Sequence, residues 1–161
     1  MGAIAAVVGG VTFAALQTNT AALTNNTLTS GTPLLQISNN NSTYGNSAAG
    51  INDTLNPGIP KSFTFYLKNN DVNPLTITAN IPTSLAGSTI LPSAVTMALD
   101  CNGHSSVSYT LDQWAGGSAA IPGTIPANTA VICHEVLTLD STYGDTGNSV
   151  VPYNINFVGN E

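Results

Sequence analysis

The residues whose types could support catalysis or metal binding lie in two short stretches, "CNGH" at Cys101–His104 and "CHE" at Cys133–Glu135. A zinc protease of the H-E-x-x-H type needs two histidines one helical turn apart, with the glutamate as general base. His134 and Glu135 supply the first half of that motif, but no second histidine follows at the required spacing. The pattern favours a His–Glu pair on the surface or edge of a strand. We predict no catalytic residues and no enzyme activity.

The cysteines and histidines could instead form a zinc site, with Cys101-x-x-His104 on one side and Cys133–His134 on the other. Neighbouring strand residues point to opposite faces, which argues against joint ligation by Cys133 and His134. In the cytosol the cysteines would remain thiols, whereas in an exported protein an even pair predicts a disulfide. A Cys101–Cys133 bridge spans 32 positions and would stabilise the fold by about 3–4 kcal/mol. We predict no metal and no cofactor.

Two further groups have a structural and a functional interpretation. Asp140 and Asp145, in "DSTYGDTGN", could hold calcium in a loop, but turn formation is the favoured role. Trp114, near two glycines, could be an exposed aromatic that binds sugars, but a core tryptophan is favoured. A monomeric cell-surface binding module, with Trp114 in contact with glycans, is one alternative function.

The amino-acid composition argues against nucleic acid and anionic membranes as binding partners. At 161 residues the chain suits one domain with a genuine core. Charged residues make up 6% of it, against roughly 25% in an ordinary globular domain. Lys61 and Lys68 are its only basic residues, and the net charge is −6. Such a chain cannot displace counterions from nucleic acid, and binding to an anionic membrane is disfavoured. Abundant Thr, Asn, Ser and Gly suit a secreted or cell-surface protein.

The N-terminal run Met1–Ala14, "MGAIAAVVGGVTFA", is apolar and rich in small residues. It is shorter than the roughly 20 residues that a membrane-spanning helix needs. It resembles the apolar part of a signal peptide, with a small-residue cleavage site before Ala15, although no Lys or Arg precedes it. The alternative is a type IV-like pilin that keeps residues 1–28 as a helix. Because the residues of Gly9–Thr12 are poor helix formers, we predict a signal remnant over residues 1–14 and no stable membrane span after cleavage.

The remainder of the chain has the period-two pattern of β-strands. In "KSFTFYLKNN" the residues Phe63, Phe65 and Leu67 share one face. Further candidate strands are "PLTITANI", "AVTMALDC", "SVSYTLDQW", "AVICHEVLTLD" and "SVVPYNINFVG". Between them lie the turn-like runs "NPGIP", "NNDVNP", "GGSAAIPGTIPAN" and "YGDTGN". This pattern predicts an all-β antiparallel sandwich or barrel.

The alternation also predicts which side chains point inward. Cys101 shares its parity with apolar residues from Val95 onward, and Cys133 does so with its own apolar neighbours, so both thiols should face the core. Glu135 falls on the inward parity too, and we therefore expect a bulge near His134–Glu135. Pro152 lacks an N–H and should mark an edge or irregular position.

Three segments carry a family resemblance: "GGVTFAALQ" with "NTLTSGTPLLQIS", then "LNPGIPKSFTFYLKNNDVNPLTITANI", then "IPANTAVICHEVLTLDSTYGDTGNSVVPYNINFV". In this order they resemble the cleavage region, the L-x-PG turn with its hairpin, and the closing strands of the TasA/camelysin family of secreted β-sandwich proteins. The resemblance implies a jelly-roll-like sandwich that is exported, trimmed by a signal peptidase and assembled into extracellular filaments of a biofilm matrix or cell surface. The cysteine pair and the segment "ALQTNT" depart from the family pattern.

In that family the N-terminal segment of one subunit completes a sheet of the next, a process called donor-strand complementation. Residues 15–30 contain no Gly, Pro or charge, so they could add to a sheet edge without losing a ladder hydrogen bond or burying a charge. We predict a donor strand at residues 15–30 and a sandwich at 31–161, polymerising head to tail. The donor-strand candidates are Ala15, Leu16, Leu23, Thr27 and Leu28. Sequons at Asn25, Asn40, Asn41 and Asn52 would carry glycans if the host modifies such sites.

Overall fold

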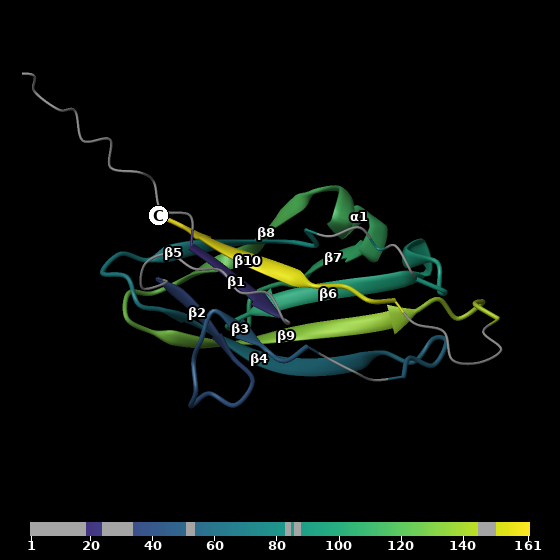
Figure 1. Cartoon of the computed structure of the whole chain (residues 1–161), viewed down its shortest axis with the longest axis horizontal. Helices are drawn as coiled ribbons and strands as arrows, with labels where there is room; N and C mark the ends of the chain where they lie inside the picture. Colours follow the sequence, from purple (N-terminus) through teal and green to yellow (C-terminus); the bar gives the residue numbers. More distant parts are fainter. Residues whose placement is uncertain (1–18, 24–33, 51–53, 83–84, 86–87, 145–150) are drawn as a thin grey trace, which may run out of the picture.

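The computed structural model describes residues 19–23, 34–50, 54–82, 85, 88–144 and 151–161 (Figure 1). The expected signal remnant at residues 1–14 lies outside this part of the chain. So do four of the five donor-strand candidates, Ala15, Leu16, Thr27 and Leu28. The fifth, Leu23, is the last residue of a strand.

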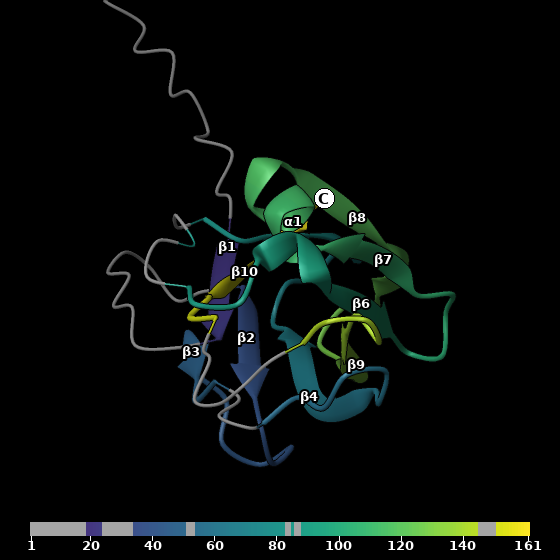
Figure 2. The ribbon, with the colours of Figure 1, turned by 90° about the vertical axis from the view of Figure 1, so that its right-hand side faces the viewer.

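The chain folds into two packed β-sheets, which confirms the β-sandwich expected from the sequence (Figures 1 and 2). Sheet A runs in the order β3 (Ser47–Ala48), β1 (Asn19–Leu23), β10 (Ile155–Asn160), β5 (Leu75–Asn80) and β8 (Ser118–Ile125). Sheet B runs in the order β2 (Leu35–Ser38), β4 (Lys61–Asn69), β9 (Ala130–Leu139), β6 (Val95–Cys101) and β7 (Val107–Thr110). Neighbouring strands are antiparallel except β1 and β3, which are parallel.

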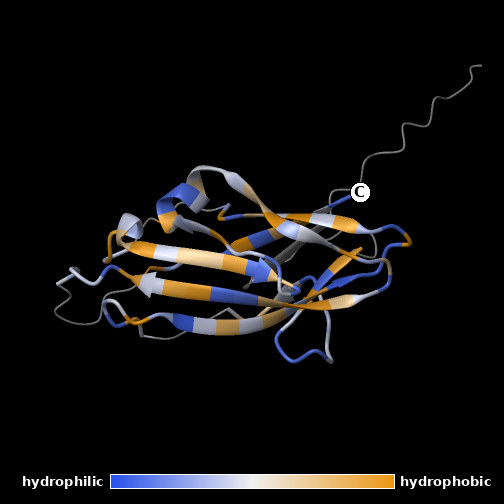
Figure 3. Cartoon of the chain, turned by 180° about the vertical axis from the view of Figure 1, so that it is seen from behind, coloured by the Kyte–Doolittle hydropathy of each residue, from blue (hydrophilic) through white to orange (hydrophobic). Residues whose placement is uncertain are grey.

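The core forms because alternate residues of each strand face the opposite sheet. Buried and more exposed residues alternate along β5, β6, β9 and β10, and Figure 3 shows the matching bands of hydropathy. Phe65 of β4 and Phe157 of β10 meet across the sandwich, with ring centroids 5.1 Å apart. The inward face predicted for "KSFTFYLKNN" is confirmed, since Phe65 and Leu67 are buried and Phe63 packs against the core.

Two elements differ from the sequence-based expectation. The run "SVSYTLDQW" is a strand only as far as Thr110, after which Leu111–Gly116 forms the short helix α1. Thr110 and Gln113 form a capping box at its start, and Leu111 and Trp114, three residues apart, share its buried face. A capped helical turn therefore replaces the end of the expected strand, because Leu111 and Trp114, three positions apart, share one face of a helix but would lie on opposite faces of a strand.

The second difference is β8, which occupies a stretch expected to be a turn. It is an edge strand of sheet A, so the missing N–H of Pro122 removes no necessary ladder bond. The β5–β8 register shifts between Thr76 and Ile77, and Gly123 adopts a positive φ of 94° on the facing strand. This irregularity absorbs the Pro-Gly pair within the strand.

The bulge expected at His134–Glu135 is wrong. Strand β9 pairs with β4 and with β6 through both residues without a register shift. Glu135 stays on the inward face because a tyrosine hydroxyl binds it there, as described below. Pro152 lies just before β10 in an irregular segment, as expected.

The two ends of the sandwich carry different connections. At the hairpin end, the β4–β5 and β8–β9 turns are joined by a hydrogen bond from the Asn128 N–H to the Asp71 carbonyl (3.1 Å), and Asn70 donates to the carbonyl of Leu34 (2.6 Å). At the loop end, which faces the viewer in Figure 2, the residues before β4, the 3₁₀-helix η1 (Pro92–Ala94) and the residues after β9 come together. Within the described part of the chain, no helix has the length and apolar character required to cross a membrane.

Candidate functional site

The first candidate site is the seam between β1 and β10. Five residues of β1 pair antiparallel with β10, from Asn19 opposite Gly159 to Leu23 opposite Ile155. On its other side β1 pairs with β3 through only two residues. If β1 were withdrawn, β10 would become an open edge with a full row of unpaired backbone groups. Strand β1 therefore covers an edge of β10, and the sequence alone did not locate this pairing.

Strand β10 is fixed to the body of the sandwich independently of β1. It pairs with β5 through five residues, and its buried residues Ile155 and Phe157 lie in the core. Gly159 is also placed for close packing, since a Cβ there would lie 2.9 Å from Leu75 Cδ1. A larger residue at position 159 would require the buried Leu75 side chain to shift. Strand β10 is thus held in place by its own core contacts.

The second candidate site is a buried carboxyl group in the centre of β9. Glu135 is fully buried, between Phe63 of β4 and Leu99 of β6 in the sheet register. The Tyr153 hydroxyl, two residues before β10, donates to Glu135 Oε1 at 2.7 Å. Glu135 Oε2 has no hydrogen-bond partner among the described residues. This contact ties the start of β10 to the middle of the opposite sheet.

Burial sets the protonation of this pair. Removal from water raises the pKa of Glu135 from 4.5 to about 7, and the hydrogen bond from Tyr153 offsets only part of that rise. Burial, together with the neighbouring carboxyl, also raises the pKa of Tyr153 well above 10. Below neutral pH the site therefore holds a neutral carboxylic acid and a neutral phenol. A neutral acid tolerates an unpartnered oxygen in the core far better than a carboxylate does.

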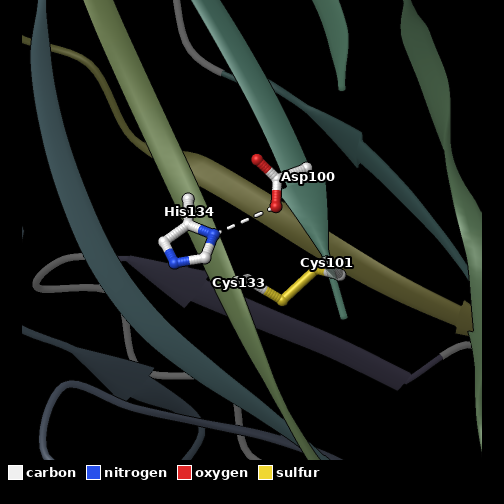
Figure 4. The surroundings of a disulfide bond; sticks show 4 residues. All are labelled: Asp100, Cys101, Cys133 and His134. Atoms are coloured by element: carbon white, nitrogen blue, oxygen red, sulfur yellow. Dashed lines mark hydrogen bonds and ion pairs between the residues drawn. A yellow bond between two sulfur atoms is a disulfide. The ribbon is translucent and has the colours of Figure 1, made fainter. Parts of the chain in front are cut away.

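The cysteine pair forms a disulfide, as expected from its parity (Figure 4). Cys101 of β6 and Cys133 of β9 are directly opposite each other in the register and their sulfurs are 1.99 Å apart. His134 Nδ1 lies 3.0 Å from Asp100 Oδ1, and this pair is partly exposed whereas both cysteines are buried. Because the cysteines bind each other, they do not ligate zinc. No group of three His, Cys, Asp or Glu side chains suited to a metal gathers within the described residues.

The disulfide is expected to contribute to the stability of the fold. Reduction, or the double substitution Cys101→Ser and Cys133→Ser, is expected to lower the free energy of unfolding by about 3–4 kcal/mol, because the bridge closes a separation of 32 positions. Urea unfolding with and without reductant measures the change. The double variant serves as control, since reductant should leave its midpoint unmoved. An unchanged wild-type midpoint in reductant would contradict the prediction.

The other candidate residues have structural roles. Trp114 is 1% exposed, and its Nε1–H donates to the Met97 carbonyl at 3.0 Å, which confirms the core interpretation and removes it as a sugar-binding surface. Asp140 Oδ1 accepts hydrogen bonds from the Thr142 N–H (2.7 Å) and hydroxyl (2.6 Å), and these lower the pKa of the carboxyl. This geometry is that of a turn. Asp145 lies outside the described residues.

Two of the four sequons fall in a bend closed by side-chain hydrogen bonds. Asn40 and Asn41 are exposed, and Asn40 Oδ1 accepts hydrogen bonds from the N–H groups of Ser42 and Thr43, both at 3.0 Å. Asn41 has a positive φ of 57°. Asn25 and Asn52 lie outside the described residues.

Comparison of the chain with protein families, with curated proteins and with solved structures finds no match. The functional interpretation therefore depends on the geometry of the chain itself.

Proposed function

We propose that the protein is a structural, non-enzymatic subunit of an extracellular filament, of the biofilm-matrix or surface-fibre kind. In this proposal the N-terminal segment, residues 15–30, leaves its own sandwich and pairs with β10 of the next subunit. The jelly-roll-like topology and the resemblance to the TasA/camelysin family belong to the same proposal. Each subunit would give a strand at one side and accept one at the other, so assembly would not close on itself.

The observation that carries the proposal is the position of β1 in sheet A. Strand β1 lies between β10 and β3, although the next strand in the chain, β2, belongs to the other sheet. Ten residues, 24–33, separate β1 from Leu34. The five residue pairs with β10 can be formed equally well by β1 of the same chain or of a neighbour, which is the condition for exchange of an identical element between protomers.

The composition of the strand and the chemistry of the body support this assignment. Strand β1 reads "NTAAL" and carries no charge, so its transfer between subunits moves no ion out of water. The disulfide suits an oxidising, extracellular compartment. Few charges and a net charge of −6 are consistent with a secreted or cell-surface protein that avoids nucleic acid and anionic lipid.

The two alternatives receive less support. A monomeric glycan-binding module had Trp114 as its contact residue, and that side chain is buried. A type IV-like pilin needs a helix through residue 28, whereas Asn19–Leu23 is a strand. Neither alternative gives a reason for an uncharged strand pairing with β10 of the body.

The proposal predicts that a proline in β1 abolishes filaments. Ala21 pairs with Phe157, and Ala21→Pro removes the residue's N–H from a strand that has neighbours on both sides. We expect the wild-type chain to form filaments in negative-stain microscopy and the variant to remain monomeric or dimeric in sedimentation. Ala21→Ser, which keeps the N–H, is the matched control and should polymerise like the wild type.

A peptide with the sequence of residues 15–30 gives a test that needs no altered subunit. Added in excess to the wild-type chain, it should occupy the β10 edge and shorten the filaments, whereas a scrambled peptide should not. If the wild-type chain stays monomeric at high concentration, or if Ala21→Pro filaments are normal, the donor-strand proposal fails.

A further inference from the structure

The segment that leads into β10 is held to the sandwich mainly by side chains. Residues 151–154 belong to no helix or strand, and residues 151–153 make no backbone hydrogen bond to another described residue. Val151 and Tyr153 pack against the core, and the Tyr153 hydroxyl donates to Glu135 Oε1 at 2.7 Å. A segment with few backbone hydrogen bonds opens at a low cost in free energy. The contact with Glu135 is therefore an attachment whose loss would allow this segment to open by itself.

The carboxyl group that accepts this hydrogen bond suits the closed segment in only one of its protonation states. Glu135 is fully buried, and its Oε2 has no hydrogen-bond partner among the described residues. A neutral acid is tolerated there, whereas a carboxylate would be a buried charge with a single hydrogen bond. Burial raises the pKa of Glu135 to about 7, so the change from one state to the other falls near neutral pH.

The elements packed around Glu135 offer its carboxylate little compensation. Its partners in the sheet register, Phe63 of β4 and Leu99 of β6, are apolar, and so are the inward residues of β5 and β10 in the facing sheet. Lys61 shares the face of Phe63 two residues earlier on β4, but it is only partly buried. The other titratable groups nearby are Asp100 and His134, which bind each other on the outer face of sheet B, and Tyr143 after β9.

We propose that the Glu135–Tyr153 contact is a proton-dependent latch on the start of β10. With the carboxyl protonated, the latch is closed. When the carboxyl loses its proton to solvent, the carboxylate is hydrated by releasing Tyr153, and residues 151–154 with Ile155 leave the sandwich while both sheets stay folded. Because Ile155 pairs with Leu23, the opening reaches one end of the seam between β1 and β10. The latch belongs to the single chain and does not depend on the proposed filament.

Limited proteolysis of the full chain with chymotrypsin, which cleaves after aromatic residues, tests the latch. Cleavage after Tyr153 requires the segment and Ile155 to leave the sandwich, and its rate follows the population of the open form. That population should rise about tenfold between pH 6 and pH 8.5, because the pKa of Glu135 is about 7 in the closed form and 4.5 in water. Glu135→Gln is the matched control, since it has no proton to lose at this position. The ratio of the two rates at each pH cancels the pH dependence of the protease.

Cleavage after Phe65, in the centre of β4, reports global unfolding in the same samples. A tenfold rise in the ratio for Tyr153, with Phe65 uncut, supports the latch. An unchanged ratio, or cuts at both sites that appear together, overturns it. Tyr153→Phe gives a second measurement that does not need Glu135→Gln to fold. Without the hydroxyl, cleavage at position 153 should be about fivefold faster at pH 6, relative to the unfolded chains, and an unchanged rate would also overturn the latch.

Discussion

Glu135→Gln is expected to raise the free energy of unfolding at pH 8 by about 3 kcal/mol and to change it little near pH 4.5. The folded-state pKa of Glu135 is about 7 against 4.5 for the free group, and each pKa unit corresponds to about 1.4 kcal/mol. The native state therefore binds the proton more tightly than the unfolded state. The contribution of this tighter proton binding to the free energy of unfolding is fully present below pH 4.5. It falls as the pH rises toward 7 and is lost above that value. Glutamine keeps an oxygen for Tyr153 and carries no charge.

Urea unfolding of the wild type and the variant between pH 4.5 and pH 8 measures this difference. Other groups, such as Asp140 with its lowered pKa, contribute equally to the pH dependence of the free energy of unfolding in both proteins. Their contributions therefore cancel in the difference. Tyr153→Phe is a useful companion, because it removes the hydrogen bond that the Glu135 carboxyl accepts from the Tyr153 hydroxyl and should destabilise the protein further at pH 8. A constant gap between wild type and Glu135→Gln at every pH would show that Glu135 does not titrate in the folded protein near neutrality.

Trp114→Ala is expected to lower the free energy of unfolding by about 3–5 kcal/mol, the range for removing a large buried aromatic side chain. The side chain is 1% exposed, it donates to the Met97 carbonyl, and the Tyr109 ring lies edge-on to it at 5.4 Å. Its loss would leave a cavity between α1 and β6 and remove the hydrogen bond from the indole to the Met97 carbonyl. Trp114→Phe keeps an aromatic ring and should cost about 1–3 kcal/mol.

Circular dichroism during thermal or urea unfolding measures the loss of free energy of unfolding in both variants. Fluorescence cannot be used, because Trp114 is the only tryptophan and is absent from both. Trp114→Ala also tests the link between the core and assembly. Because the residue is far from solvent, the variant should lose stability without losing any surface contact of the proposed filament. A loss below 1 kcal/mol would show that the surrounding core collapses into the vacated space.

Local pattern predicted the parts of the fold in which one face of a strand is buried. The alternation along Phe63–Leu67 and along β9 placed the core residues correctly, and the common inward parity of Cys101 and Cys133 predicted the disulfide. The pattern failed at Leu111–Gly116, where the period-two spacing of the strand changes to the i, i+3 spacing of a short helix, and where an edge position tolerates Pro122 in a strand. Such ambiguities are resolved by the neighbouring strand, which a local pattern does not contain.

The candidate sites depend on pairings between distant residues. The sequence predicted a strand in residues 15–30 but did not predict its pairing partner. The register that sets Leu23 opposite Ile155 has no local sequence signature. Parity placed Glu135 inward and led to the expectation of a bulge, which was wrong because Tyr153 reaches it from the opposite sheet. That partner is recognised only in three dimensions, since nothing in the residues around Tyr153 indicates its contact with β9.

The antiparallel pairing of β1 with β10 has a mechanical consequence for a filament built on it. A pull along the filament would draw β1 toward the loop end, parallel to the axis of β10, because Leu23 leads on to the donor's own body. The load is then a shear that the hydrogen bonds of all five residue pairs bear at once. Pulling the strand sideways would instead break them one after another. A short, uncharged strand can in this way hold a fibre under tension while remaining exchangeable when no force acts on it.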